Sequence, residues 1–468
     1  MLSRKSRFAL YFGNRGFFPS SLIHSAREEM VRVLRGLGHE TVLIDENAVP
    51  HGAVETADQG RIYAEFLRRN RGKFDGVILS LPNFGDENGA VAALQDAGVP
   101  ILIQAYPDEL DQLGPQSRRD AFCGKLSIMD VFQQVGIRFT ILKPHTVRPS
   151  SDAFARNIDT FDRVCRIVGR MRRMTVGAVG ARTTAFKTVR VDELALQAHG
   201  INIETIDLSE IFTRMDSLRT SKNSFKDKME HLKQAANWNN APEKALVNLA
   251  KLGVVLDELV DQFHMDAMAI RCWIELQSRY GISPCLVTGD LAERAVPTAC
   301  EVDIANAVTM FALTQASGEA SGILDWNNNY GDEENKCILF HCGNVPRSLM
   351  VEKGTISDHL ILSNSLGAGH GFGCNVGRIR PMDMTFGSMM TKEGSVDFYL
   401  GQGQITNDQF SKQFFGCAGV AEINNLQDVL QYIGRTGHRH HVSITPGHLV
   451  EPMVEAFRNY LGYQVTTV

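Results

Sequence analysis

Residues 75–106 read DGVILSLPNFGDENGAVAALQDAGVPILIQAY, and this stretch decides the fold class of the chain. Its two apolar runs, DGVILSL and PILIQAY, are typical of strands buried on both faces, where hydrophobic residues are nearly continuous. The segment at 87–97 between them is typical of a helix. A strand, a helix and a second strand in this order predict a parallel pair of strands joined by a crossover helix.

The same alternation extends outward from this stretch in both directions. Further strands are expected at RFALYF, ETVLID and RFTILK, and further helices at 21–37, 56–69 and 117–135. Residues 1–168 are therefore expected to form an open α/β domain with a parallel sheet. A second α/β domain is expected at 169–320, with strands at RRMTVGAVG, INIETID, MDAMAIRC and SPCLVTGD.

The sequence pattern changes after Gly322, where short strand-like segments alternate with turns rich in Gly, Asn and Asp. Examples are KCILFHC, HLILSNS and SVDFYLGQGQI. This pattern is typical of antiparallel sheets. The predicted fold is thus two open parallel-sheet α/β domains followed by a β-rich, barrel-like antiparallel domain at 321–468.

Composition excludes several classes of protein. A net charge of −5 argues against a nucleic-acid-binding protein, which is expected to be basic. Nine cysteines without a CxxC motif argue against a disulfide framework and favour a reducing cytoplasm. No stretch approaches the length of a membrane span, and the apolar run near the start is too short for a secretory signal.

Four polar residues stand inside otherwise apolar segments and are candidate ligands of a metal ion. They are Glu301 in ACEVDIANAVTMFAL, Asp325 in GILDWNNN, His341 in CILFHCGN and His441 in HRHHVSITPGH. Two carboxylates and two imidazoles suit a divalent cation such as Mn²⁺. Buried carboxylates are costly unless they are paired or bound to a metal.

Each of these residues also has an ordinary structural interpretation. An acid such as Glu301 is favoured in the first turn of a helix, and Asp325 is a suitable turn former at the end of a strand. His341 is compatible with a hydrogen-bonded core histidine, and His441 with a solvated turn. The glycine-rich stretch at 366–373 lacks a full GxGxxG and a following helix, so it does not predict a nucleotide site.

Over essentially its whole length the chain resembles the L-fucose isomerase and L-arabinose isomerase family. The most specific motifs are CEVDIANAVTM, the aspartate at 325 and the pair His441-VSITPG-His448. The resemblance implies that Glu301, Asp325 and His441 bind the metal. It also matches His341 with an additional histidine ligand that the arabinose enzymes have and the fucose enzymes lack.

The resemblance implies an aldose–ketose isomerase that acts on an open-chain sugar through an enediolate, with Glu301 and Asp325 as general acid/base groups. Mn²⁺ is the implied cofactor, with Co²⁺ and Mg²⁺ as alternatives. His448 is expected to bind substrate, as are Arg15 and Asn83 in loops of the first domain. A homo-oligomer, a trimer or a hexamer, is implied, with the active site at a subunit interface.

Two other functional classes remain open on the sequence. One is a sugar-binding relative that has lost catalysis, and the other is an epimerase or aldolase that uses Mn²⁺ to stabilise an enediolate. Fold does not fix function, so product analysis is needed to separate them. The identity of the sugar also stays open, with L-fucose, arabinoses and C6-modified hexoses, including sulfonated ones, as candidates.

Overall fold

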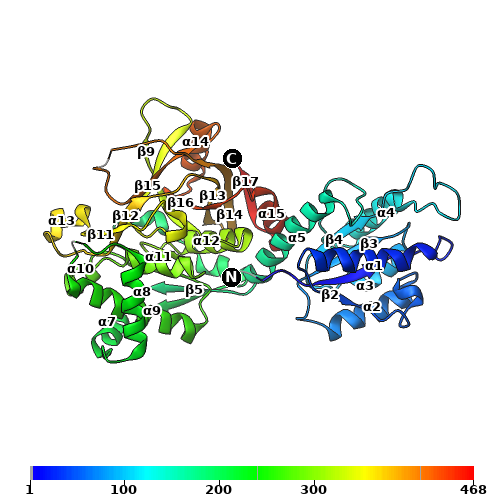
Figure 1. The fold of residues 1–468 in the computed structure, drawn as a ribbon, viewed down its shortest axis with the longest axis horizontal. Coiled ribbons are helices and arrows are strands. Elements are labelled where there is room, and N and C mark those ends of the chain that lie inside the picture. The colour runs from blue at the N-terminus through cyan, green and yellow to red at the C-terminus, as the bar shows by residue number, and fades with distance from the viewer. Residues whose placement is uncertain (1–3, 240, 412) are drawn as a thin grey trace. The chain divides into compact units, whose positions relative to one another are not determined.

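The chain forms two compact units in a computed structural model that describes residues 4–239, 241–411 and 413–468 (Figure 1). The N-terminal unit contains the described residues up to Arg170 together with Glu451–Gly462. The main unit contains Met171–Val450 and Tyr463–Val468. The further division of the main unit at 320–321 stays a prediction.

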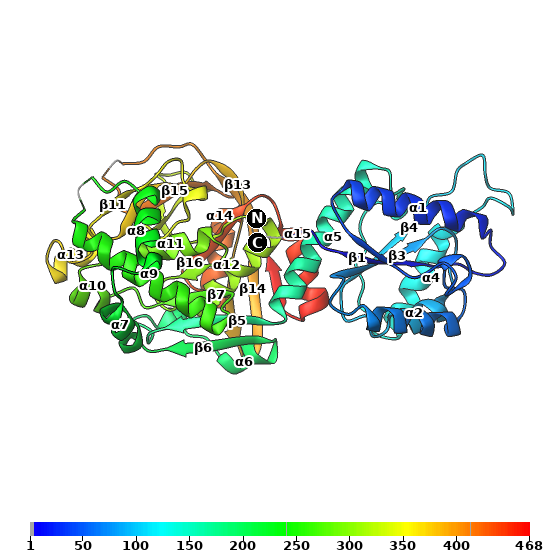
Figure 2. The same ribbon diagram turned by 60° about the horizontal axis from the view of Figure 1, so that its bottom comes forward.

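The N-terminal unit is an open α/β structure around a four-stranded parallel sheet with strand order β2-β1-β3-β4. Its strands are β1 (Phe8–Phe12), β2 (Thr41–Leu43), β3 (Gly76–Leu81) and β4 (Ile101–Ala105). Its helices are α1 (Ser21–Gly36), η1 (Pro50–Gly52), α2 (Ala57–Arg69), α3 (Glu87–Leu94), α4 (Ala121–Gln134) and α5 (Asp152–Met171). Figure 2 shows α1 and α2 on opposite sides of the sheet, as expected for strands buried on both faces.

The end of the chain returns to this unit through α15 (Val450–Val454) and the π-helical segment η4 (Glu455–Leu461). Tyr460 Oη accepts a hydrogen bond from the backbone N–H of Ile101 at 3.3 Å and lies 2.9 Å from Thr140 Oγ1. The prediction of a fifth strand at RFTILK is wrong. Thr140 of this segment forms only an isolated β-bridge with Leu102 of β4.

The main unit begins with a second parallel sheet, whose order is β6-β5-β7-β8. Its strands are β5 (Met174–Val179), β6 (Ile201–Ile206), β7 (Ala267–Ile270) and β8 (Thr298–Ala299). The helices in this part are η2 (Lys187–Val189), α6 (Glu193–Ala198), α7 (Leu208–Ser217), α8 (Asn223–Ala235), α9 (Glu243–Phe263), α10 (Glu275–Tyr280), α11 (Cys285–Glu293) and α12 (Ile304–Ser317).

A nine-stranded sheet follows, with order β11-β12-β15-β10-β9-β16-β13-β14-β17. An additional pairing of β15 with β14 closes part of this sheet into a barrel, and most of its pairs are antiparallel. The strands are β9 (Gly322–Asn329), β10 (Lys336–His341), β11 (Thr355–Ser357), β12 (Cys374–Arg378), β13 (Met382–Lys392), β14 (Ser395–Ile405), β15 (Cys417–Glu422), β16 (His441–Pro446) and β17 (Gln464–Thr467). The helices here are η3 (Arg347–Leu349), α13 (Leu360–Leu366) and α14 (Leu426–Thr436). The predicted fold class of parallel sheets followed by a β-rich barrel is confirmed.

Two predicted strands are helices. SPCLVTGD forms most of α11, and HLILSNS forms most of α13. Short apolar runs cannot be assigned to strand or buried helix from periodicity alone, and Cys285–Glu293 is buried over nearly its whole length. No helix in the described part of the chain has both the length and the apolarity needed to cross a membrane.

Helix α12 connects the two sheets of the main unit. It packs on β7 and β8 of the parallel sheet and on β16 and β13 of the barrel. Its residues are buried from Ile304 to Ala316, as expected of a helix that is apolar on all sides. The loop before Ile304 is therefore held between the carboxyl ends of the parallel strands and the barrel, which is where ligands bind in open α/β sheets.

Candidate functional site

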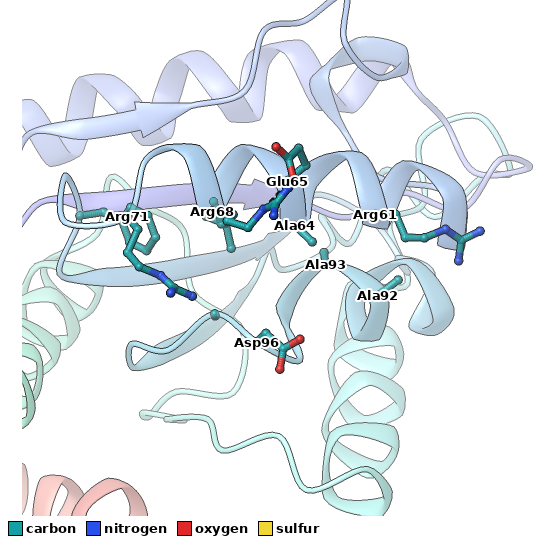
Figure 3. A pocket seen from close by; sticks show the side chains of 11 residues that line it. Arg61, Ala64, Glu65, Arg68, Arg71, Ala92, Ala93 and Asp96 are labelled. Atoms are coloured by element: carbon teal, nitrogen blue, oxygen red, sulfur yellow. Dashed lines mark hydrogen bonds and ion pairs between the residues drawn. The ribbon is translucent and has the colours of Figure 1, made fainter.

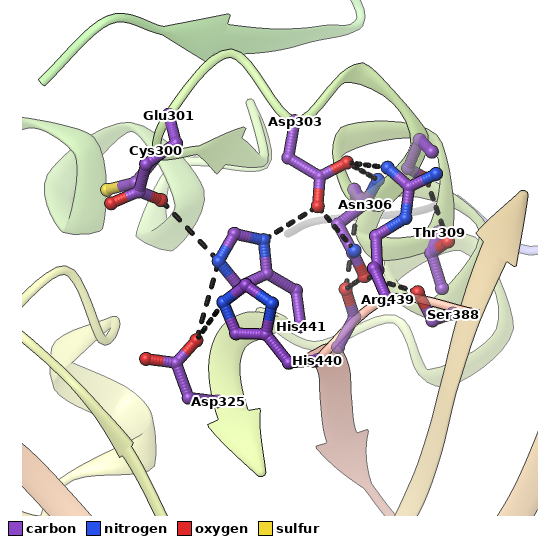
Figure 4. Close-up of polar contacts among 12 residues, drawn as sticks. Cys300, Glu301, Asp303, Asn306, Thr309, Asp325, Ser388, Arg439, His440 and His441 are labelled. Atoms are coloured by element: carbon purple, nitrogen blue, oxygen red, sulfur yellow. Dashed lines mark hydrogen bonds and ion pairs between the residues drawn. The ribbon is translucent and has the colours of Figure 1, made fainter. Parts of the chain in front are cut away.

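The main unit brings together the four residues that the sequence singles out as metal ligands (Figure 4 draws three of them with their partners). Glu301 Oε2 lies 3.6 Å from His441 Nε2 and 3.7 Å from His341 Nε2. Asp325 Oδ1 lies 3.4 Å from His441 Nε2. Residues separated by as many as 140 positions thus form two overlapping groups that share His441, one with Glu301 and His341 and one with Asp325 and His440.

Strand register explains why Asp325 and His441 meet, and His341 joins them from the end of the neighbouring strand. Asp325 on β9 pairs directly with His441 on β16, so both side chains project from the same face of the sheet. On the other side of β9, Asp325 pairs with Phe340 of β10, and His341 follows as the last residue of that strand. Neighbouring strands therefore deliver one carboxylate and two imidazoles to one end of the barrel.

Glu301 enters from a strained turn between β8 and α12. Its φ is +55° and that of Val302 is +59°, a left-handed conformation that is unusual for a β-branched residue. The sequence placed Glu301 at the start of the helix, but Asp303 is the N-cap and accepts from the backbone N–H of Asn306 at 3.1 Å. The turn instead directs Glu301 toward the barrel.

One oxygen of Glu301 is held by donors that precede α10. Oε1 accepts from Trp273 Nε1 at 3.2 Å and from the thiol of Cys272 at 3.4 Å. Burial raises the pKa of Cys272 to about 12, so the thiol stays protonated and remains a donor. This arrangement leaves the other oxygen, Oε2, to face the two histidines.

The orientation and tautomer of His441 are fixed by a buried acid. His441 Nδ1 lies 2.8 Å from Asp303 Oδ2, and Asp303 also forms an ion pair with Arg439. Burial would raise the pKa of Asp303, but the charge of Arg439 and the contact with His441 lower it well below its usual range. Because Asp303 is ionised, His441 Nδ1 donates, and its Nε2 faces Glu301 and Asp325 and has a lone pair there when the ring is neutral.

His341 has the opposite tautomer. Its Nδ1 accepts the backbone N–H of Cys342 at 2.9 Å, so the neutral ring carries its proton on Nε2. That N–H faces Glu301 Oε2. The two histidines therefore differ chemically, since the neutral ring of His441 has a lone pair on the Nε2 that faces Glu301, and the neutral ring of His341 has a hydrogen on its Nε2.

The charge state of Glu301 follows from these neighbours. Burial alone would raise the pKa of its carboxyl. The imidazoles of His341 and His441 and the indole N–H of Trp273 outweigh burial and lower this pKa to about 2. Glu301 is therefore ionised at neutral pH.

Two buried carboxylate oxygens lack a partner in this arrangement. Glu301 Oε2 and Asp325 Oδ1 have no hydrogen-bond partner in the described part of the chain. Buried, unpaired carboxylate oxygens are costly. They lie 3.6 Å and 3.4 Å from His441 Nε2, and two carboxylates with one imidazole are a donor set that suits a divalent cation.

Further residues form the wall of the cluster and were missed by the sequence analysis. Phe186 packs its ring 5.9 Å from that of His441 and 5.7 Å from that of Trp273. His440, whose Nε2 lies 3.5 Å from Asp325 Oδ1, is half-exposed beside them. For Asp303 the available signal was its place two residues after Glu301 in CEVDIANAVTM. Nothing in the local sequence marked Phe186 or Trp273.

His448, which the sequence predicts to bind substrate, lies outside this cluster. His448 follows the far end of β16, a strand whose rise places that end about 17 Å from His441. Its Nε2 lies 3.3 Å from the carbonyl oxygen of Gly403. Arg15 and Asn83 belong to the N-terminal unit, and their predicted roles stay predictions.

Both N-terminal residues are held by local contacts. Arg15 stacks over the ring of Phe84 at 4.3 Å and forms an ion pair with Glu87. Asn83 is fully buried and donates to Asn14. The loops after β1 and β3 are thus organised by their own side chains at the carboxyl end of the first sheet.

A separate pocket of about 230 Å³ lies between α2 and α3 of the N-terminal unit (Figure 3). It is lined by Arg61, Ala64, Glu65, Leu67, Arg68, Arg71, Phe74, Ala92, Ala93, Asp96 and Ala97. Arg61 pairs with Asp58 and Arg68 pairs with Glu65, so most of its charge is neutralised locally. It contains no set of groups comparable to the buried cluster of the main unit.

Comparison with known proteins gives matches at both ends of the chain. The family model described as the N-terminal domain of fucose/sulfoquinovose isomerase matches residues 9–172. The model described as the C-terminal domain of L-fucose isomerase matches residues 339–468.

Curated relatives agree with these matches. A sulfoquinovose isomerase from Priestia aryabhattai is 20% identical over 87% of this chain and 89% of that protein. One from Alkalicoccus urumqiensis is 21% identical over 65% of this chain and 68% of that protein. Among solved structures, D-lactate dehydrogenase from Escherichia coli aligns at 12% identity over 66% of this chain and 94% of that one, but its TM-score of 0.16 carries no argument.

Proposed function

Because the chain belongs to the fucose/sulfoquinovose isomerase family and is an aldose–ketose isomerase, we propose that it works by metal-dependent proton transfer at Glu301, Asp325 and His441. The observation that carries this proposal is the pair of buried, unpartnered carboxylate oxygens that face one imidazole nitrogen, His441 Nε2. A hexose sulfonated at C6 is the first substrate to test, because the curated relatives bear the name sulfoquinovose isomerase.

The proposed metal ligands are Glu301 Oε2, Asp325 Oδ1 and His441 Nε2, the last being the atom that both carboxylates face. Carboxylate and imidazole together suit Mn²⁺, with Co²⁺ or Mg²⁺ as alternatives. When bound, such a cation supplies electrostatic stabilisation of the negative charge that develops on the sugar oxygens. Asp303 is the positioning residue that fixes His441 for this role.

His341 is better suited to donate a hydrogen bond than to bind the metal. Its Nε2 carries the proton in the neutral ring, because Nδ1 accepts from the backbone. A ligand nitrogen must offer a lone pair, so ligation through Nε2 requires His341 to give up the contact with Cys342. We therefore assign the Nε2–H of His341 to Glu301 or to a sugar hydroxyl beside it.

The two carboxylates are the proposed proton carriers. Isomerisation moves one proton between C1 and C2 of the open-chain sugar, through an enediolate. Glu301 is ionised at neutral pH, so it can accept a proton from carbon. Asp325 is 21% exposed and is the carboxylate that a sugar entering past His440 meets first. Trp273 and Cys272 keep Glu301 in place during the transfer.

The N-terminal unit is proposed to contribute to an active site shared between subunits of a homo-oligomer, a trimer or a hexamer. The loops that contain Arg15 and Asn83 lie at the carboxyl end of its sheet, where α/β sheets bind ligands. Beside Arg15, Phe17 is 80% exposed, which suits a surface that another subunit covers. Mixing inactive Glu301→Gln subunits with inactive Arg15→Ala subunits restores activity if the site is shared and gives none if each chain works alone.

Ketose formation from a panel of aldoses tests the proposal. The protein is stripped with a chelator and then given Mn²⁺, with sulfoquinovose, L-fucose, L-arabinose and D-arabinose as substrates. Ketose that appears only after Mn²⁺ is restored supports the proposal. Solvent deuterium in the ketose supports proton transfer through an enediolate, and an epimerised aldose in place of the ketose contradicts isomerisation.

A further inference from the structure

A basic loop covers the cluster of Glu301, Asp325 and His441. Residues 180–191, GARTTAFKTVRV, follow the carboxyl end of β5 and contain Arg182, Lys187 and Arg190 but no acidic residue. The proposed isomerisation makes no use of these three positive charges.

Two sets of contacts fix this loop over the cluster. The ring of Phe186 lies 5.5 Å from that of His440 and 5.9 Å from that of His441. On the other side, Arg271 Nη1 donates to the carbonyl oxygens of Ala181 and Arg182 at 3.1 Å and 3.3 Å. Arg271 directly precedes Cys272 and Trp273, which hold Glu301.

The arginines around the cluster differ in whether their charge is neutralised. Arg271 forms two hydrogen bonds of 2.6 Å with the carboxylate of Glu275, and Arg439 pairs with Asp303. Arg182 Nη1 instead donates to the carbonyl oxygens of Thr183 and Phe186, at 3.4 Å and 3.1 Å. Within the described residues no carboxylate lies at ion-pair distance from Arg182, and its guanidinium is half-buried.

We propose that Arg182 binds an anionic group on the end of the sugar remote from C1 and C2, a sulfonate being the group of first choice. This inference rests on the proposed function and adds the residue that selects a charged substrate. Arg182 donates to the backbone carbonyl oxygen of Phe186, and the Phe186 ring packs against that of His441. Phe186 is therefore the single residue that connects the guanidinium to the cluster. The proposal requires that a six-carbon sugar with its reacting end at Glu301 extends its other end toward this loop.

The chemistry of the guanidinium suits such a group. Its planar fork of donors matches the oxygen geometry of sulfonate or phosphate, and the two carbonyl contacts hold it in place without cancelling its charge. Lys187 and Arg190 are exposed on the same loop and raise the positive potential through which an anion approaches. A neutral sugar gains nothing from these charges.

The test compares Arg182→Ala with Arg219→Ala, which removes the same charge at an exposed position in the turn between α7 and α8. Substrates are sulfoquinovose, glucose 6-phosphate and glucose, which differ at C6. We expect Arg182→Ala to lower kcat/KM for sulfoquinovose roughly 10- to 100-fold, mainly through KM. Activity on glucose and all activities of Arg219→Ala should stay within about twofold of the wild type. Arg182→Lys should recover part of the loss.

Binding to chelator-stripped protein, measured by calorimetry, tests the inference without turnover. The wild type should bind sulfoquinovose more tightly than glucose, and salt should weaken that preference, because the contact is ionic. A wild type without this preference, or an Arg182→Ala protein that keeps it, overturns the inference. An equal loss on glucose and sulfoquinovose in a folded variant also overturns it, since that indicates a role in loop structure.

The comparison of glucose 6-phosphate with sulfoquinovose shows whether Arg182 distinguishes a phosphate from a sulfonate. Equal use of phosphate and sulfonate means that Arg182 recognises anionic charge alone, which keeps the inference in its general form. Absence of ketose from every aldose contradicts the proposed function, whereas the calorimetric comparison still decides the role of Arg182. The two failures are therefore distinguishable.

Discussion

His441 Nδ1 lies 2.8 Å from Asp303 Oδ2, and this buried contact turns His441 Nε2 toward Glu301 and Asp325. His341, on the other side of Glu301, has its Nδ1 occupied by a backbone N–H and turns a hydrogen to the same point. One cluster thus holds a histidine prepared to bind a cation and a histidine prepared to donate a hydrogen bond. The first prediction follows from this difference.

Replacing the two histidines by asparagine should have unequal effects on metal binding. His441→Asn removes a proposed ligand, so Mn²⁺ affinity should fall at least roughly 100-fold. His341→Asn removes a donor, so affinity should change by less than about threefold while kcat falls. Free Mn²⁺ measured by electron paramagnetic resonance gives both affinities. Equal losses in the two variants would show that both histidines are ligands.

Metal affinity should depend on pH through His441. Burial alone would lower the pKa of its imidazole, but the hydrogen bond and charge of Asp303, with the charges of Glu301 and Asp325, raise it to about 9. The metal-free ring is therefore protonated at neutral pH, and Mn²⁺ must displace that proton. Between pH 6.5 and 9, affinity should rise about tenfold per pH unit. Calorimetry in buffers of different ionisation enthalpy should detect about one proton released, and no release would contradict this pKa.

Stability of the metal-free protein should fall as the same group titrates. The folded pKa of His441, about 9, lies above its ordinary value of 6.5, so the stabilisation is complete below pH 6.5 and is lost as pH rises through 9. The expected loss is of the order of 3 kcal/mol. Urea unfolding of chelated protein at several pH values measures it. The variant His441→Asn, which has no group to titrate there, should lack this pH dependence.

Trp273 should contribute to the acidic limit of activity, beside the larger contributions of His341 and His441 to the low pKa of Glu301. Its indole N–H lowers the pKa of Glu301, so Trp273→Phe should move the acidic limb of the kcat profile to higher pH. Mn²⁺ affinity should change little, because Oε1 of Glu301 is not the proposed ligand atom. A profile identical to that of the wild type would show that the indole contributes nothing to the charge state of Glu301.

Glu301 should be indispensable for turnover and dispensable for folding. The amide of Glu301→Gln keeps an oxygen that can accept from Trp273, but it cannot accept the proton from the sugar. Ketose formation should fall at least roughly 100-fold, with an unchanged circular dichroism spectrum. A folded variant with substantial activity would remove Glu301 from the proton transfer.

The sequence predicts the strands and helices of this protein better than it predicts the side chains that surround the four polar residues of the site. Apolar runs such as FALYF and GVILSL identify the parallel strands, since a strand buried on both faces has a nearly continuous hydrophobic pattern. The same criterion fails for Cys285–Glu293, which is apolar because it is a buried helix. Periodicity does not distinguish the two cases over so few residues.

The four polar residues stand out because each is polar within an apolar segment. Their partners do not stand out, because contacts between distant segments select them. Asp303 meets His441 across 138 positions, and Trp273 reaches Glu301 from a loop after another strand. The tautomer of His341 depends on one backbone N–H of its own strand end, which no sequence pattern reports.

The most direct test of the central claim is ketose formation from sulfoquinovose by chelated protein, before and after Mn²⁺ is restored, in the wild type and in His441→Asn. The account predicts that Mn²⁺ restores turnover in the wild type and fails to do so in the variant at the same metal concentration. Turnover by the chelated wild type at its full rate, or equal restoration in the variant, would contradict a catalytic metal held by His441 with Glu301 and Asp325.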